Sequence, residues 1–222
     1  RNNLTNNIWF TEEYIPGISL RGSGRSMDYF AGWFSSGDKD PEFGDFKGGT
    51  FLLLNIGHDF AARAEADEAL VRVNYVHNQP DPDNGFTNDL EDIVSLHFRY
   101  QKGGWGIRTD LSAGKGYYGQ SDLWGFVVMP FRNFGPHWQI VGRYTFINSK
   151  EDNGIRFSRY ERAIADGKGD RYNELYLGFN YYWYGHRLKL QNGLQYVDMR
   201  DRAGDGGAWS GWSWTTGFRL SW

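Results

Sequence analysis

The chain has 222 residues, of which 40% are hydrophobic and 18% aromatic, and its 24 basic and 27 acidic residues give a net charge of −3. The absence of cysteine excludes a disulfide scaffold and a cysteine metal site, and the slightly acidic balance argues against nucleic acid as a partner. No run of about 20 apolar residues occurs, so only a β-barrel could cross a membrane with this composition.

Alternating apolar and polar residues predict β-strands along most of the chain and almost no helix. In chain order, strands are expected at residues 16–23, 26–35, 48–60, 68–78, 90–101, 105–114, 120–131, 138–148, 173–184, 187–199 and 209–222. Most contain 10–13 residues, which is closer to the roughly 9–11 of a tilted membrane-crossing strand than to the roughly 5–6 of a sandwich strand. Residues 5–14 are a candidate twelfth strand, and bacterial barrels have even strand numbers. The expected fold is therefore all-β: an antiparallel transmembrane β-barrel, with residues 1–222 as one domain.

Two of the expected strands are apolar on both sides, at residues 51–54 and 123–131. Either Gly125 marks a β-bulge, or a loop folds inward and covers the second side. The sequence leaves both interpretations open. Residues 156–167 are a candidate short helix.

The connections between the expected strands alternate in length. Short turns are expected at residues 22–25, 61–67, 102–103, 132–136 and 185–186, and longer loops at 36–47, 78–89, 115–120, 149–170 and 200–208. Outer-membrane barrels have short periplasmic turns and long external loops. This alternation makes residues 149–170 the longest external loop and places the last strand, which ends on Trp222, with its end towards the periplasm.

A barrel assigns the polar side of each strand to the lumen and the apolar side to lipid. The expected lumen cations are Arg72, Arg99, Arg108, Arg143, Lys189 and Arg219, and the expected lipid-facing residues are Trp105, Leu111, Trp138, Ile140, Leu175, Phe179, Leu188, Leu194, Trp214, Phe218 and Trp222. Rings of arginine and lysine favour anions, and the arginine fork suits phosphate. The alternative is that these arginines fill space and pair with the inward acids Asp110 or Glu174.

Other motifs give weak signals. Residues 114–119 match GxGxxG, but an aromatic strand follows instead of a helix, so a hairpin loop is expected. The acidic run at residues 81–92 lacks EF-hand spacing, and the five histidines are scattered singly. We expect no metal site, no cofactor and no enzymatic activity.

Three stretches resemble the phosphate-selective porin O and P family. They are YFAGWFSSGDKDPEFGDF at residues 29–46, the paired strands and YGH turn of residues 159–199, and WSWTTGFRLSW at residues 212–222. The resemblance implies a homotrimeric, sixteen-stranded porin, of which this chain would be the C-terminal portion. The outward aromatics expected near the C-terminal strands, which would meet at the threefold axis, are Tyr181, Trp183, Trp209, Trp212 and Trp214. About five N-terminal strands would then be missing. The family's inward-folded constriction loop would be missing as well.

The function expected from these features is passive diffusion of small anions such as phosphate across the outer membrane of a Gram-negative bacterium. The expected partners are the lipid bilayer, lipopolysaccharide, two further copies of the chain and, through the C-terminal strand, the barrel-assembly machinery. A general or organic-anion porin is an alternative with the same architecture. A soluble, aromatic-rich, carbohydrate-binding β protein is an alternative from another class.

Overall fold

The computed structural model describes residues 16–35, 49–81, 88–157, 161–185 and 187–221. The strands are β1 (Gly17–Ser23), β2 (Met27–Ser35), β3 (Thr50–Asp59), β4 (Glu68–Asn78), β5 (Leu90–Lys102), β6 (Trp105–Gly116), β7 (Leu123–Phe134), β8 (Trp138–Ser149), β9 (Arg171–Tyr182), β10 (Leu188–Arg200) and β11 (Trp209–Leu220). All eleven expected strands are thus confirmed, whereas the candidate twelfth strand at residues 5–14 lies outside the described residues. No helix in the described part of the chain is long and apolar enough to cross a membrane.

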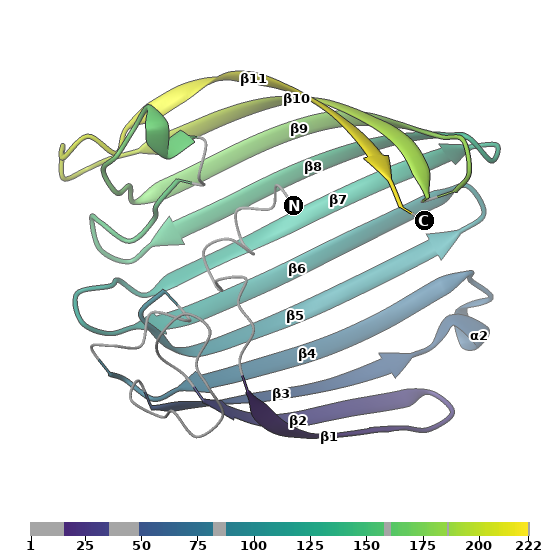
Figure 1. Cartoon of the computed structure of the whole chain (residues 1–222), viewed down its shortest axis with the longest axis horizontal. Coiled ribbons are helices and arrows are strands. Elements are labelled where there is room, and N and C mark those ends of the chain that lie inside the picture. Colours follow the sequence, from purple (N-terminus) through teal and green to yellow (C-terminus); the bar gives the residue numbers. More distant parts are fainter. Residues whose placement is uncertain (1–15, 36–48, 82–87, 158–160, 186, 222) are drawn as a thin grey trace.

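The strands form one antiparallel sheet in which each strand pairs with its neighbours in the sequence, from β1 to β11. Figure 1 shows this sheet as a curved, barrel-like wall, with β1 and β11 at opposite sides. The expected all-β, antiparallel class is confirmed. The wall is not closed, because β1 and β11 do not pair with each other.

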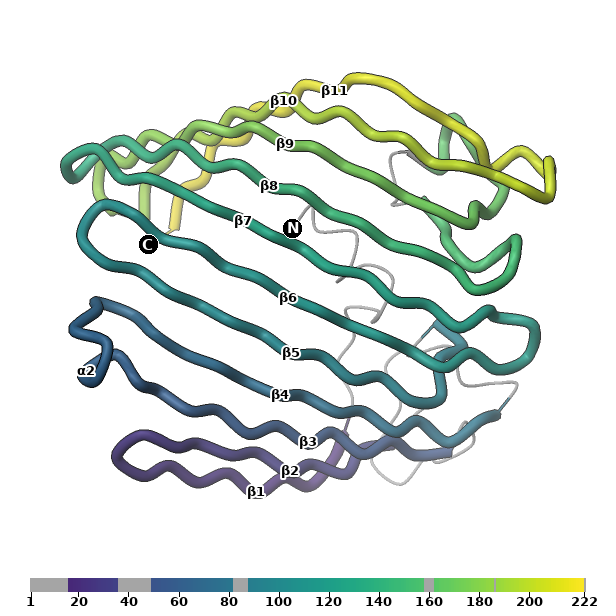
Figure 2. Tube along the Cα trace, turned by 180° about the vertical axis from the view of Figure 1, so that it is seen from behind, coloured from purple at the N-terminus to yellow at the C-terminus, as the bar shows by residue number. Residues whose placement is uncertain are grey.

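Short and long connections lie at opposite ends of the strands, as Figure 2 shows for the described segments. We call the end with the short connections the turn edge and the opposite end the loop edge. The connection between β3 and β4 at the turn edge contains the one-turn helix α2 (Ala61–Ala64). Glu65 ends that helix with a left-handed backbone, at φ 49°. The predicted alternation of connection lengths is therefore present.

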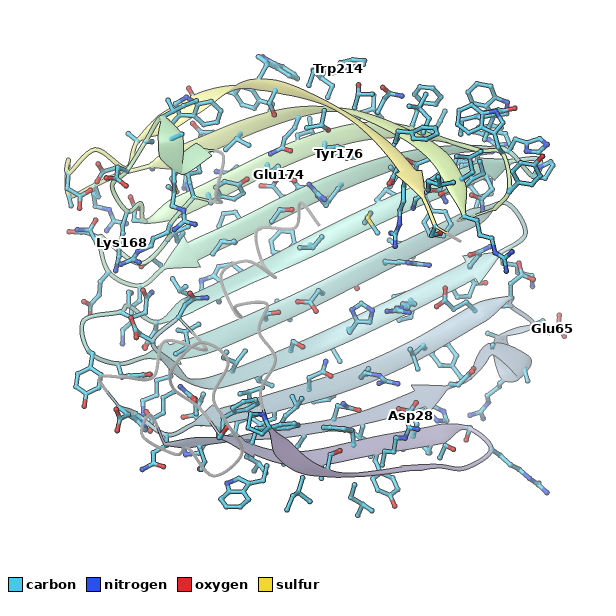
Figure 3. All side chains as sticks on the ribbon, in the orientation of Figure 1. Asp28, Glu65, Lys168, Glu174, Tyr176 and Trp214 are labelled. Carbon is cyan, nitrogen blue, oxygen red and sulfur yellow. The ribbon has the colours of Figure 1, made fainter. Side chains whose placement is uncertain are left out.

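Each strand presents alternate side chains to two faces. The inner face carries Arg72, Arg143 and Glu174, and a cavity lined from β5 to β11 opens on it. The outer face carries the large exposed apolar side chains, including Leu175, Leu177 and Trp214. Figure 3 shows Glu174 and Tyr176 on the inner side of the wall, and Trp214 pointing away from it.

Part of the longest loop, residues 150–170, folds onto the inner face at the loop edge. Ile155, Phe157 and Ala165 join a buried apolar cluster with strand residues of that face, among them Leu123 and Ile147. The rings of Phe157 and Trp209 meet edge to face, with centroids 5.7 Å apart. The inward-folded loop thus accounts for Leu123 at the loop end of β7, whereas Met129 and Phe131 of the same strand line the cavity of the inner face.

Gly125 is not a bulge, because it pairs in register with Ser112 on one side and Ile147 on the other. The irregularity in this sheet lies in β5, between Leu90 and Asp92. The candidate helix at residues 156–167 is reduced, in the described part of that segment, to the 3-10 turn η1 (Glu161–Ala163).

The loop anchor gives a stability prediction. Phe157 is 3% exposed, so Phe157→Ala should lower the free energy of unfolding by about 3–5 kcal/mol through the cavity it leaves. Ile164 lies in the same loop but is 71% exposed, so Ile164→Ala should change stability by less than about 0.5 kcal/mol. Urea unfolding in detergent measures both variants. Equal stability of the two would show that the loop is not anchored by this cluster.

Candidate anion pathway

All of the expected lumen cations lie on the inner face, and the strand register places several of them next to one another. Arg99 is directly opposite Arg108 on the neighbouring strand, and Lys189 is directly opposite Arg219. Like charges in directly opposed positions destabilise a sheet unless other groups compensate them. The acids and ring systems around each cation therefore determine what the pathway can do.

Arg72 is neutralised by Asp28. One guanidinium nitrogen of Arg72 donates to both carboxylate oxygens, at 2.6 and 2.8 Å, and a second nitrogen reaches the Asn55 amide oxygen at 3.4 Å. Gly57 makes room for this pair, because a Cβ there would lie 2.7 Å from the carboxylate and 2.9 Å from the guanidinium. Asp28 was not among the expected inward acids because its own strand carries none of the expected cations.

Arg99 and Arg108 share one carboxylate, Glu68, with N···O distances of 3.6 and 3.7 Å. Arg99 also donates to a ring nitrogen of His97 at 2.7 Å, and the other ring nitrogen of His97 is 3.7 Å from Asp110. Asp110 therefore faces a histidine and not an arginine. Two cations against one carboxylate leave this part of the turn edge with an excess of positive charge.

Arg143 forms the most buried ion pair, with Glu174. Arg143 donates two hydrogen bonds to one carboxylate oxygen at 2.8 and 2.5 Å, and the Glu174 side chain is 2% exposed. The other carboxylate oxygen accepts bonds from the Tyr172 hydroxyl at 2.9 Å and from the Gln195 amide at 3.2 Å. This pair matches the alternative interpretation, in which an arginine pairs with Glu174.

The ring of Tyr176 lies beneath the guanidinium of Arg143, 4.9 Å from ring centroid to guanidinium carbon. Gly178 and Gly193 oppose each other on β9 and β10, and a Cβ on either one would lie within 2.5 Å of this ring. The paired glycines thus form a flat slot that fixes the ring, and the ring in turn holds the arginine by a cation–π contact.

Lys189 and Arg219 differ from the other cations. Among the residues that the structure describes, neither has a carboxylate within ion-pair distance. Lys189 is 9% exposed, and its ammonium lies 5.9 Å from the centroid of the Tyr182 ring. The uncompensated positive charge of the inner face therefore gathers at the turn edge.

The expected lipid-facing residues that the structure describes all lie on the outer face, namely Trp105, Leu111, Trp138, Ile140, Leu175, Phe179, Leu188, Leu194, Trp214 and Phe218. Trp222 lies outside the described residues. Near the turn edge, the rings of Trp138, Tyr181 and Trp183 form a chain with centroids 4.5 and 4.7 Å apart. Trp209, which also belonged to the outward aromatics expected near the C-terminal strands, lies instead on the inner face against Phe157.

At the loop edge, a group of possible metal ligands combines His77, Glu91 and Asp92, with ligand atoms within 4.8 Å of one another. Lys115 already lies 2.8 Å from Glu91, so one carboxylate of the group has its own cation. The loops also hold internally bonded acids. Burial alone would raise the pKa of Asp201, but backbone N–H donors of Gly204, Gly207 and Gly206 outweigh it and lower that pKa.

No model of a protein family matches the chain, and no curated protein is similar to it. The porin resemblance therefore depends on the residues and patterns that carry it, together with the wall described above.

The buried pair predicts a specific loss of stability. Glu174→Gln leaves Arg143 buried without a counter-charge and should lower the free energy of unfolding by about 3–5 kcal/mol. Glu91→Gln removes a carboxylate from the pair with Lys115, whose side chain is 62% exposed, and it should cost less than about 1 kcal/mol. Urea titration in detergent compares the two. A loss for Glu174→Gln no larger than for Glu91→Gln would contradict the compensation described for Arg143.

Proposed function

We propose that this chain forms the wall of an outer-membrane porin that conducts small anions by passive diffusion. The observation that carries the proposal is the separation of chemistry between the two faces of one long-stranded sheet. The outer face presents exposed apolar side chains on nearly every strand, and the inner face carries arginines, acids and amides. A wall with lipid on one side and water on the other requires this division.

The charge balance of the inner face supports a weak preference for anions. It does not favour a site that binds an inorganic anion tightly. Arg72 and Arg143 are matched by acids, whereas Arg99 and Arg108 share the one carboxylate of Glu68. Lys189 and Arg219 have no carboxylate within ion-pair distance among the described residues. Conduction requires binding that favours entry but still permits release. This balance favours a general or organic-anion porin at least as much as a phosphate-selective one.

The proposed setting follows from the same surfaces. The outer face would contact lipid and, near the loop edge, lipopolysaccharide, in the outer membrane of a Gram-negative bacterium. The aromatic outer surface near β9–β11 would meet two further copies in a homotrimer, and β11 would engage the barrel-assembly machinery. The trimer follows from the family resemblance, and mass measurement in mild detergent tests it.

The lipid-facing assignment predicts depth-dependent costs. Leu177 is exposed at the centre of β9 on the outer face, so Leu177→Arg should lower folding stability in lipid vesicles by about 2–4 kcal/mol. Thr215 lies at the centre of β11 on the inner face, so Thr215→Arg should cost far less. Denaturant titration in vesicles distinguishes them. Equal tolerance of arginine at both positions would argue for a soluble protein with water on both faces.

The ion preference predicts an effect of the cations at the turn edge. Replacing Arg99 and Arg108 by glutamine removes two charges and leaves Glu68 unpaired. The anion-over-cation permeability ratio should therefore fall, most strongly at low salt, where screening is least. Lys102→Gln with Lys115→Gln is the matched control, because it removes the same charge from side chains outside the pathway. A reversal potential in a salt gradient that shifts equally in both double variants would contradict the assigned pathway.

A further inference from the structure

A cavity of about 1050 Å³ opens on the inner face of β5–β11 towards the turn edge. Ligand cavities of about 300–1,000 Å³ hold molecules of drug size, so this space is far larger than an inorganic anion needs. Its lining includes Arg108, Arg143, Lys189, Tyr176 and Tyr182. The cavity combines cations, aromatic rings and amides on one wall, which suggests a ligand that is more than a bare ion.

Lys189 is the strongest sign of an anionic group in this cavity. It is nine-tenths buried, and no hydrogen bond or ion pair joins its ammonium to any residue in the described part of the chain. Its directly opposite neighbour on β11 is another cation, Arg219. A buried ammonium next to a second positive charge is costly without a counter-ion. A ligand that brings negative charge to Lys189 would remove that cost.

Arg108 contributes a second donor to the same cavity. Its Nε is buried and has no hydrogen-bond acceptor among the described residues. Its terminal nitrogen is 3.7 Å from Glu68, beyond hydrogen-bond distance, and its guanidinium carbon lies 5.6 Å from the centroid of the Phe131 ring. Arg143 also lines the cavity, but its charge is taken up by Glu174. Lys189 and Arg108 are therefore the two lining cations with bonding capacity to offer.

A row of side-chain amides crosses the wall of the cavity between these cations. Asn180 donates to the Gln139 oxygen at 2.8 Å, and Gln191 donates to the Asn180 oxygen at 3.2 Å. The Tyr182 hydroxyl donates to the same Gln139 oxygen at 3.0 Å. The Gln139 oxygen is filled by these two bonds, and its nitrogen also donates to Asn133 at 2.9 Å, but Asn180 and Gln191 keep unused donors and lone pairs. The row is pre-ordered and retains capacity for hydroxyl groups of a ligand.

We propose that this cavity is a binding site for sugar-sized organic anions that carry hydroxyl groups. Lys189 binds the phosphate or carboxylate, Arg108 offers a second cation on the same cavity lining, and the amides of Gln139, Asn180 and Gln191 bind the hydroxyls. The proposal rests on the porin function, which gives the solute access to the cavity. It deepens that function by naming the class of substrate. Inorganic phosphate alone would reach the cations but not use the amide row.

The test measures binding to the folded chain in detergent by calorimetry, with glucose 6-phosphate, inorganic phosphate and glucose as probes. Glucose 6-phosphate should bind more tightly than either of the other two. Lys189→Gln should weaken it about tenfold or more, as expected for loss of a hydrogen bond to a charged group. Arg108→Gln is the second variant and should also weaken it. Lys115→Gln removes the same charge from the outer side of the sheet and should leave binding unchanged.

Two results would overturn the site. One is inorganic phosphate binding as tightly as glucose 6-phosphate, and the other is unchanged binding in both the Lys189 and Arg108 variants. Conductance of the same preparations in planar bilayers separates this outcome from failure of the porin function. A chain that conducts anions without discriminating among the probes overturns the site alone, whereas a chain that binds glucose 6-phosphate but forms no channel supports the site and overturns the porin.

Discussion

The arrangement of this molecule depends on the strict two-residue period of a β-strand in an antiparallel register. Because each strand pairs only with its sequence neighbours, each residue's parity fixes its face for the whole wall. A slip of one residue in any strand would move its arginines to the apolar face and its aromatic rings inward. The division between a charged inner face and an apolar outer face is thus a property of the register as much as of composition.

Part of the positive charge on the inner face is paired with carboxylates, and the rest is unpaired and lies in one region. Buried ion pairs cost desolvation, and they remain stable when further hydrogen bonds satisfy both partners. Glu174 meets this condition through Arg143, Tyr172 and Gln195. Asp28 balances Arg72 on one side of the wall, whereas Glu68 is shared by Arg99 and Arg108, so positive charge remains in excess at the turn edge from β5 to β11. A solute would therefore meet an uneven wall, nearly neutral in one region and basic in another.

Much of the wall was predictable from sequence because alternation reports directly on the two faces. Every strand and the face of each expected cation follow from it. The compensating acids were harder to predict, since Asp28 and Glu68 act across strands and only the register shows which residues they face. Trp209 was misplaced because it lies where a loop covers the inner face, and there an aromatic side chain is buried on the side that is polar elsewhere. The row of amides had no sequence signal, because glutamines and asparagines on the polar side of a strand look like ordinary surface residues.

The slot that holds Tyr176 has a consequence for how this sequence can change over time. Its ring occupies the space that side chains at Gly178 and Gly193 would need, so the three positions share one volume. A larger residue at either glycine displaces the ring, and loss of the ring opens a hollow that a larger residue would fill. Because the ring of Tyr176 contacts the guanidinium of Arg143, moving or removing the ring also removes this cation–π contact. Substitutions at these positions are therefore tolerated as a set, and among descendants of this sequence they should covary, although Gly193 lies on a different strand from Tyr176 and Gly178.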